Sequence, residues 1–469
     1  MNFLLTANLH SRYKEPTTLI VHTKEFRDML DRVFKIKEAG STIRTEIIAG
    51  VTTFMTMAYI IFVNPAILSQ GAKMDFNAVM VATCLTAAVA TILMALLANY
   101  PIAQAPGMGI NALFSFEICA SMGVSWPIAL GIVFLSGSLL LLLTVVKIRE
   151  MICEAIPEGI KYGIATGIGI FIAFIGLKEA GIVVSDPATF VTMGDLSSPP
   201  TILAIAGLLV TAILMARQIK GAILIGIIFT GILGIFMGIV EYRGLVSTIP
   251  SISPTWGKLD IIGALKLTYL TPIVTLLFLN MFDTIGTLIG VSEQAGMLRD
   301  GTLPRAGRAL MPDAIGTTFG ALCGTSPITS YIESAAGVSE GGRTGLANIV
   351  TAFLLLLSLF FSPLASMFGG GYVVEGSGMI LHPVTAPALI VVGSLMMHNI
   401  TKIRWSAPDE SIPAFLTIIT MPLTFSISNG IAIGFISCPI IKLFCGKGRE
   451  VHWMVYLLSI IFIAGYLLV

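Results

Sequence analysis

The sequence contains few charged residues. Of its 469 residues, 11% are charged and 55% are hydrophobic, and the 27 lysines and arginines nearly balance the 26 aspartates and glutamates. Soluble domains carry about 25% charged residues, so this scarcity excludes an ordinary soluble protein. The near-zero net charge and the lack of a basic tract exclude nucleic acid as a partner. The composition therefore predicts a membrane protein.

Motifs for metals, disulfides and dinucleotides are also lacking. The six cysteines include no Cys-x-x-Cys pair, which argues against a metal site and a disulfide framework. Residues 107–112 (GMGINA) fit a dinucleotide-binding pattern, but no strand–helix–strand unit surrounds them. We therefore expect neither a cofactor nor an enzyme. His382 and His398 are expected near the membrane interface, without an acidic partner.

Apolar runs of helical length follow one another from Ile47 onward, and a helix needs about 20 apolar residues to cross a bilayer. We predict an all-α polytopic membrane protein with fourteen spans. The first seven are 47–68, 77–97, 107–120, 124–146, 157–177, 200–216 and 221–240. The second seven are 270–291, 309–323, 328–338, 346–363, 384–397, 412–425 and 429–444. Residues 452–469 form either an added span or a tail packed on the bundle.

The distribution of basic residues predicts the orientation. Residues 1–46 form a polar head without a secretory signal, so the head is expected in the cytosol. The loops on its side carry Lys147, Arg149, Lys161, Arg217, Lys220, Arg299, Arg305, Arg308, Arg343, Lys402, Arg404, Lys442, Lys447 and Arg449. The other side carries Lys73, Lys178, Arg243, Lys258 and Lys266. We predict a multi-pass plasma-membrane protein with a cytosolic N-terminus, surrounded by lipid.

Two of the predicted spans are too short for a bilayer and begin alike. Residues 101–104 (PIAQ) introduce the third span and residues 327–330 (PITS) introduce the tenth. The offset, 327 − 101 = 226, also carries the first span largely onto the eighth. Seven spans are an odd number, so the second copy enters the membrane from the opposite side. This pattern predicts an inverted repeat, whose paired interrupted segments indicate a binding site at the midplane.

The interrupted segments suit ligand binding because a helix that begins inside the membrane leaves backbone N–H groups without partners. Such groups are tolerated only inside protein or along a cavity. Pro106, Gly107 and Gly109 prevent regular helix in the first segment, and residues 324–333 form the second. A helix kink is as good an explanation for either segment alone. Their matched positions favour a site.

Acidic residues at membrane depth are a second signal. Asp283 lies in the middle of the eighth span, and Glu333 lies about one turn into the tenth. A carboxylate there costs on the order of 3 kcal/mol on insertion scales and usually faces the protein interior. Glu117, near the outer end of the third span, is either a gate residue or a side chain that reaches to the interface. We prefer the second interpretation for Glu117.

Four blocks of sequence carry a family resemblance: 52–65 (TTFMTMAYIIFVNP), 105–112 (APGMGINA), 281–288 (MFDTIGTL) and 324–338 (GTSPITSYIESAAGV). They resemble the nucleobase/cation symporter-2 family, in its guanine/hypoxanthine/adenine permease branch. The resemblance implies a core domain (47–147 and 270–366) and a gate domain (157–241 and 384–444). It also suggests a homodimer formed through the gate domain.

The same resemblance implies roles for individual residues. Asp283 and Glu333 match the acids of the eighth and tenth spans, and Asn111 matches the asparagine of the third. The substrate of the family lies between the two short segments, against the eighth span. Asn280 is a departure, because relatives often have an acid there, one turn before the Asp283 position. A second carboxylate that assists proton coupling is therefore in doubt.

A purine base fits the chemistry of these residues, because its N–H donors and ring acceptors need complementary partners. Asp283 and Glu333 would accept from the ring, and backbone N–H groups near 109–112 and 330–333 would donate to it. Phe54, Phe282 and Tyr331 are candidates for stacking, although packing alone also explains each of them. The predicted binding residues are Asp283, Glu333, Asn111, Gly109, Thr329, Ser330, Phe54 and Phe282.

Three hypotheses for function follow. The first is a proton-coupled importer of purine bases, with Asp283 and Glu333 as the coupling residues and Asp283 as the first candidate; the sequence contains no recognisable Na⁺ cage. The second keeps the fold but moves anions, since helix N-termini suit a negative ligand, although the two carboxylates would repel one. The third is a membrane enzyme or a receptor, which is disfavoured because the sequence contains no compact group of catalytic residues. The choice among hypoxanthine, guanine, adenine and xanthine stays open.

Overall fold

The computed structural model describes residues 27–146, 149, 156–298, 303–374 and 380–468. Part of the predicted cytosolic head, residues 1–26, and the predicted loop residues Lys147 and Arg299 lie outside these ranges. The described chain is mostly helical, with three pairs of very short strands.

Residues 27–34 are helical, and the further elements of the first half follow from residue 43. They are α2 (Ile43–Met57), α3 (Ile60–Gly71), α4 (Phe76–Leu93) with a π-helical end (Met94–Ala98), β1 (Gln104–Pro106), α5 (Met108–Ala112) with a π-helical continuation (Leu113–Ser121), α6 (Trp126–Val145), α8 (Glu158–Glu179), β2 (Val183–Asp186), β3 (Phe190–Met193), α9 (Pro199–Ala216) and α10 (Ala222–Phe236).

The second half also contains a short strand followed by a short helix, within residues 328–339. Its elements are α11 (Ile261–Ala264), a 3₁₀ turn (Leu267–Tyr269), α12 (Leu270–Gln294), α13 (Ala306–Ala309), α14 (Met311–Cys323), β4 (Ile328–Ser330), α15 (Ser334–Ser339), α16 (Gly345–Leu357), a 3₁₀ turn (Ser358–Phe361), α17 (Ser362–Gly369), β5 (Tyr372–Val373), β6 (Ile380–Leu381), α18 (Ala386–Met396), a 3₁₀ turn (Met397–Lys402), α19 (Pro408–Thr424), α20 (Ile427–Phe444), a 3₁₀ turn (Gly448–Glu450) and α21 (Trp453–Leu468).

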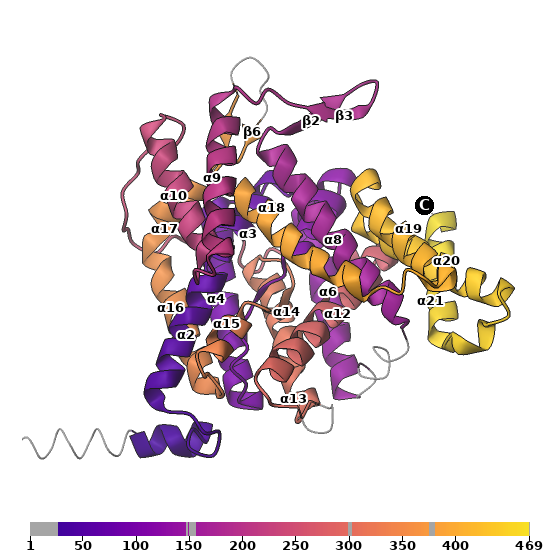
Figure 1. Ribbon diagram of the computed structural model, residues 1–469, viewed down its shortest axis with the longest axis horizontal. Coiled ribbons are helices and arrows are strands. Elements are labelled where there is room, and N and C mark those ends of the chain that lie inside the picture. Colours follow the sequence, from indigo (N-terminus) through magenta and orange to yellow (C-terminus); the bar gives the residue numbers. More distant parts are fainter. Residues whose placement is uncertain (1–26, 147–148, 150–155, 299–302, 375–379, 469) are drawn as a thin grey trace, which may run out of the picture.

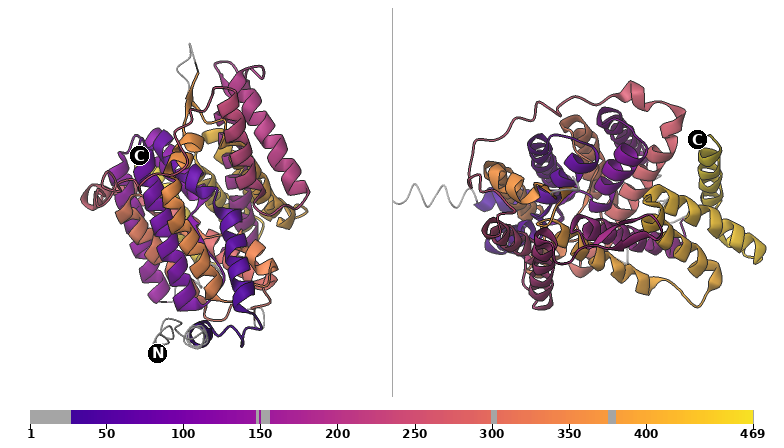
Figure 2. Two further views of the ribbon diagram at one scale, coloured as in Figure 1. Left: turned by 90° about the vertical axis from the view of Figure 1, so that its left-hand side faces the viewer. Right: turned by 90° about the horizontal axis from the view of Figure 1, so that it is seen from above.

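Helices of membrane-spanning length support a multi-pass protein. Within the described residues, eight apolar helices are long enough to cross a bilayer, and Met108–Ser121, Ala222–Phe236 and Trp453–Ala464 are apolar but shorter. Each of the fourteen predicted spans contains helix, and β1 precedes the short third span, whereas β4 forms the first residues of the short tenth span. The C-terminal apolar run forms α21, which packs on α20 and α12 and lies at the edge of the molecule (Figure 2).

The helices form two packed groups. In one group, α6 packs on α14, and α16 packs on α2 and α4; in the other, α8 packs on α18 and α19, and α19 packs on α20. Figure 1 shows α13 and the chain ahead of α2 at one end of the molecule, and the β2–β3 hairpin at the other.

A stripe of glycines explains how closely α8 approaches α19. A Cβ added to Gly163 would lie 3.1 Å from the Ala414 Cα, and one added to Gly167 would lie 3.2 Å from the Ile418 Cα. The sequence indicates a small-residue stripe at these positions, which suggests a contact between gate and core. The close packing is confirmed, but the partner α19 belongs to the predicted gate itself.

Two polar pairs at the helix ends differ from expectation. His382 Nδ1 lies 2.8 Å from Glu179 Oε2, so the expectation that His382 lacks an acidic partner is wrong. Arg149, counted above as a loop residue, is buried and forms a 2.6 Å ion pair with Asp313 at the start of α14. Arg149 also donates to the Leu310 carbonyl. The cost of burying these two charges is offset because each partner is hydrogen bonded.

Candidate substrate site

The two interrupted segments lie side by side. Strands β1 and β4 pair antiparallel, with Gln104 opposite Ser330 and Pro106 opposite Ile328. The Gln104 side-chain amide donates to the Ser330 hydroxyl at 2.8 Å, and Gly107 N–H donates to the Pro327 carbonyl at 3.1 Å. Gln104 and Ser330 are 226 residues apart, which is the offset of the predicted repeat. The structure thus brings the two predicted segments together.

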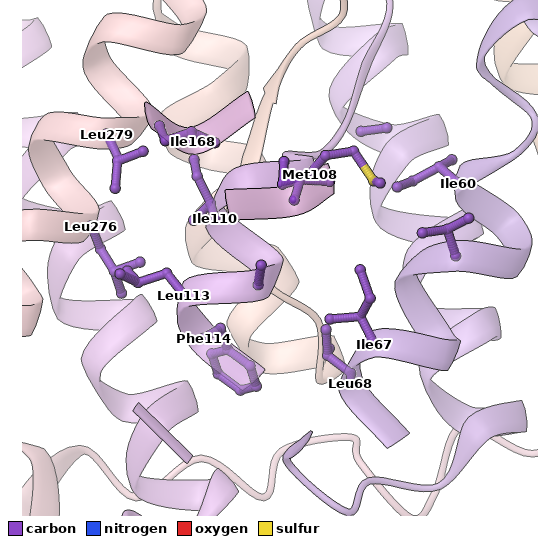
Figure 3. Packing of buried hydrophobic residues seen from close by; sticks show 14 of the residues in the cluster. Ile60, Ile67, Leu68, Met108, Ile110, Leu113, Phe114, Ile168, Leu276 and Leu279 are labelled. Carbon is purple, nitrogen blue, oxygen red and sulfur yellow. The ribbon is translucent and has the colours of Figure 1, made fainter. Parts of the chain in front are cut away.

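Burial explains why these short strands pair. All three residues of each strand are buried, and buried backbone groups need partners. Beyond β1, the apolar side chains of the third-span helix anchor it. Figure 3 shows Ile110 and Leu113 beside Leu276 and Leu279 of α12, and Met108 near Ile60 of α3. The extended segment before α5 is therefore fixed from both sides.

Glu333 is held by the first span. The Tyr59 hydroxyl donates to Glu333 Oε1 at 2.5 Å, and the Thr56 hydroxyl donates to the Glu333 carbonyl at 3.2 Å. The helix of the first span is interrupted between α2 and α3, immediately before Ile60, and this break positions Tyr59. Pro65 lies inside α3 and has no backbone N–H group to donate to the helix. Neither Tyr59 nor Thr56 was predicted as a site residue, although both lie in the first of the four blocks quoted above, 52–65.

Asp283 lies in the same neighbourhood. It interacts electrostatically with Glu333, Tyr59 and Tyr331, and it is hydrogen bonded to the Thr329 side chain of β4. Asp283 and Glu333 are both only partly buried. The structure therefore places three predicted binding residues together: Asp283, Glu333 and Thr329.

Open space runs along α12 from Asp283. Gly286 and Gly290 follow Asp283 at helical spacing and are exposed. A Cβ added to Gly286 would meet no atom within 4 Å, and one added to Gly290 would meet only Ile332 Cδ1, at 3.9 Å. The face of α12 that follows Asp283 therefore leaves room at Gly286 and Gly290.

Asn111 lies in a buried polar network. Its side-chain amide donates to Asn64 Oδ1 at 3.1 Å, and Asn64 in turn donates to Thr83 and Thr325. Ser326 also donates to Asn64 Oδ1, at 3.2 Å. Asn111 and Asn64 are completely buried. In this conformation Asn111 therefore links α5, α3 and the chain ahead of β4.

Asn280 supports β4. Its side-chain amide donates to the Thr317 hydroxyl at 2.9 Å and to the Ile328 carbonyl at 3.1 Å, and the residue is completely buried. A carboxylate at this position could not donate either bond. The asparagine at position 280, where relatives often have an acid, thus anchors β4, the strand that carries Thr329.

The other predicted residues lie around these segments. Phe282 stacks on Phe278, with ring centroids 5.9 Å apart, and Phe54 is partly buried against the main apolar cluster. Tyr331 is buried, and its hydroxyl donates to the Pro106 carbonyl at 2.5 Å. A Cβ on Gly109 would lie 2.5 Å from Ile168 Cγ2 of α8, so α8 covers Gly109 closely.

Glu117 is placed differently from our interpretation. The carboxylate is buried and accepts from the Ser426 hydroxyl at 2.8 Å, from Ile427 N–H at 2.8 Å and from Ser428 N–H at 3.3 Å. It therefore caps the start of α20, where N–H groups without helical partners favour a negative charge. The interpretation as a side chain that reaches to the interface is wrong. Sequence spacing could not reveal this contact, because Ile427 lies 310 residues from Glu117 along the chain.

A mostly helical membrane protein with two paired, interrupted segments is the architecture of a membrane transporter. The permease family model (Xan_ur_permease) matches residues 44–433. The chain therefore belongs to this family of nucleobase:cation symporters, which are transporters and not enzymes.

Characterised relatives include purine permeases. The chain is 44% identical over 436 residues to the adenine permease AdeP of Escherichia coli, covering 93% of this chain and 95% of that protein. It is 44% identical over 441 residues to the guanine/hypoxanthine permease PbuO of Bacillus subtilis, covering 92% and 98%. A permease of Methanocaldococcus jannaschii is 52% identical over 435 residues, covering 92% and 97%.

Solved structures confirm the type of fold. The transmembrane domain of the cyanobacterial bicarbonate transporter BicA resembles the chain with a TM-score of 0.62 at 14% identity, covering 82% of this chain and 97% of that domain. At this identity the likeness concerns the fold alone. The protein is thus a multi-pass permease with a fold like that of BicA.

Proposed function

We propose that the protein imports purine nucleobases (hypoxanthine and guanine, or adenine) by proton symport with alternating access. The observation that carries this proposal is the position of Asp283 and Glu333. Both are partly buried carboxylates beside paired interrupted segments, and open space lies along the α12 face that carries Asp283. The adenine and guanine/hypoxanthine permeases among the relatives support purines as the substrate class.

The two carboxylates would accept N–H groups of the purine, and Thr329 would contact the ring next to Asp283. Hydrogen bonds to a charged acceptor are stronger than neutral ones, which suits recognition of a neutral, planar base. Gly109 and Ser330 remain proposed contacts through their segments, and Phe54 and Phe282 remain proposed stacking residues. For Asn111, the bond to Asn64 favours a role in fixing the first segment.

Carboxylates at membrane depth commonly belong to proton pathways. Asp283 is the first candidate for the group that takes up the transported proton, because it lies beside the open space, and Glu333 is the second. Asn280 cannot assist as an acid, because a side-chain amide does not titrate, and it anchors β4 instead.

Alternating access would require relative movement of two domains. We propose a core of α2–α6 and α12–α17 and a gate of α8–α10 and α18–α20, consistent with the two packed groups of helices. The basic loops favour a cytosolic N-terminus. The family resemblance favours a homodimer formed through the gate.

Anion transport is the alternative, because the N-termini of the two short helices would suit a negative ligand. Against it stand Asp283 and Glu333, which would repel an anion at the place where the two segments meet. In the described residues, the site contains no lysine or arginine to offset them.

Uptake assays in a cell that lacks purine transport would test the proposal. Labelled hypoxanthine, guanine and adenine are supplied, with each base and bicarbonate as competitors and with a protonophore. We expect purine uptake that the protonophore abolishes and bicarbonate does not reduce, and at least tenfold less uptake for Asp283→Asn and Glu333→Gln at equal amounts in the membrane. Asp186→Asn, in the exposed β2–β3 hairpin, is the matched control. Unchanged uptake in both site variants would rule out this site, whereas uptake driven by Na⁺ would rule out only the proton coupling.

A further inference from the structure

The turn between α9 and α10 reaches across to the other group of helices. α9 and α10 pack on each other and on α18, whereas α15 packs on α2 and α12. Lys220, in that turn, forms an ion pair with Glu340, the residue that follows α15. In the described part of the chain, this is the one ion pair that joins the two groups of helices. It links the proposed gate to the proposed core.

The same turn lies close to the elements that hold Glu333. A Cβ added to Gly221 would lie 3.2 Å from the Met55 carbonyl oxygen. Met55 precedes Thr56, whose hydroxyl donates to the Glu333 carbonyl. Glu333 and Glu340 are the N-cap and C-cap residues of α15. The turn therefore lies against both the first span, which holds Glu333, and the far end of the helix that Glu333 begins.

Charge explains why Glu340 pairs with a cation. The last carbonyl groups of a helix form the negative end of its dipole, so a carboxylate beside them is disfavoured unless a cation is near. Arg343 supplies one cation from the same segment, because it donates to the Val338 and Gly342 carbonyls. Lys220 supplies a second from the other group of helices. Arg343 stays with α15 when the groups move, whereas Lys220 does not.

The ion pair is weak enough to open. The Lys220 and Glu340 side chains are 46% and 30% exposed, and exposed ion pairs contribute little to stability because water solvates both partners once they separate. The link between Glu117 and α20 is different, because its carboxylate is buried and accepts three hydrogen bonds. Of these two links, the exposed ion pair is the one that can break and re-form at little cost.

We propose that Lys220 and Glu340 form a reversible latch between the gate and the helix that Glu333 begins, closed in this conformation and open in the alternate one. This inference rests on the proposed function, because a latch has a role only if core and gate move relative to each other. While the latch is closed, the α9–α10 turn holds the end of α15 that carries Glu340. Its opening releases that end when the two groups separate there.

A cross-link tests whether the pair must separate during transport. Lys220→Cys and Glu340→Cys are combined with Cys445→Ser, because Cys445 is exposed, and a reducible bifunctional thiol reagent joins the two new cysteines. We expect uptake of labelled hypoxanthine to fall at least about tenfold on cross-linking and to recover on reduction, since transport needs the movement. Unchanged uptake after complete cross-linking would overturn the proposal.

The matched control is an ion pair inside one group of helices. Lys447 Nζ lies 3.0 Å from Asp409 Oδ2, and the Lys447 side chain is as exposed as that of Lys220. Cross-linking of Lys447→Cys with Asp409→Cys should leave uptake unchanged, because α19 and α20 pack on each other and move together. An equal loss of uptake in this control would contradict the latch, because the loss would then not depend on joining core to gate.

Reversal of charge is the second test. Lys220→Glu places two carboxylates together and should lower uptake about threefold to fivefold at equal amounts in the membrane, the scale of one exposed ion pair. Lys220→Glu combined with Glu340→Lys should restore uptake to within about twofold of the wild type, which a purely structural role for either position would not do. A double variant as slow as Lys220→Glu would contradict the latch.

The outcomes also separate this inference from the proposed function. If Asp283→Asn abolishes purine uptake and the cross-linked chain still transports purine, the proposed function stands and the latch fails. If the wild-type protein takes up no purine, the proposed function fails, and the latch fails with it.

Discussion

Glu117 and Glu333 are both carboxylates on interrupted helices, but their surroundings differ. Glu117 accepts three hydrogen bonds from the start of α20, two of them from backbone N–H groups. Glu333 accepts from the Tyr59 hydroxyl and from its own backbone N–H, and it is more exposed than Glu117. A buried acid that accepts several hydrogen bonds from the start of a helix stabilises the fold, whereas a partly exposed acid with fewer donors keeps acceptor capacity for a ligand. The number of donors separates the two roles; depth in the membrane does not.

Replacing each of the two acids by alanine should have the largest effect, on stability in one case and on uptake in the other. Glu117→Ala leaves three polar groups at the start of α20 without an acceptor, and we expect the free energy of unfolding to fall by about 3 kcal/mol. Glu333→Ala should abolish purine uptake, and it should lower stability by about 1 kcal/mol because it leaves the buried Tyr59 hydroxyl without its acceptor. Denaturation of the purified protein and uptake at equal membrane abundance measure the two effects.

The KM for the transported base in Glu117→Ala is the discriminating control. It should stay within about twofold of the wild-type value, because Glu117 contacts α20 and not the site. A Glu117 variant that retains its stability but loses substrate affinity would abolish the distinction between the two acids.

The two segments also differ in how closely α8 covers them. A Cβ on Gly109 would lie 2.5 Å from Ile168 Cγ2, so Gly109→Ala should push α8 away and reduce uptake several-fold, by overpacking that costs about 1–3 kcal/mol. Gly109→Ala combined with Ile168→Ala should restore most of the uptake. Failure of this rescue would show that Gly109 acts through its backbone and not through its distance from α8. The test compares the rates of purine uptake by the single and the double variant at equal amounts in the membrane.

Sequence reasoning predicted the parts of the site that depend on order along the chain. The offset of 226 residues anticipated that Gln104 and Ser330 lie together, and acidic side chains at membrane depth singled out Asp283 and Glu333. It missed Tyr59 and Thr56, because their contact with Glu333 depends on a break in the first span whose geometry the letters do not specify. It misjudged Glu117 and the pairing of His382 for the same reason: each partner lies hundreds of residues away, and only packing brings it near.

Ser426→Ala should have the smallest effect and sharpens the account of Glu117. Ser426 both donates to Glu117 Oε1 and accepts from Asn429 N–H, as an N-cap residue of α20 does. Loss of an N-cap hydroxyl costs about 1 kcal/mol, and Glu117 would keep the N–H groups of Ile427 and Ser428. We therefore expect a small fall in the denaturation midpoint and unchanged uptake. A loss as large as that of Glu117→Ala would mean that the hydroxyl, and not the two backbone N–H groups, holds this carboxylate at the start of α20.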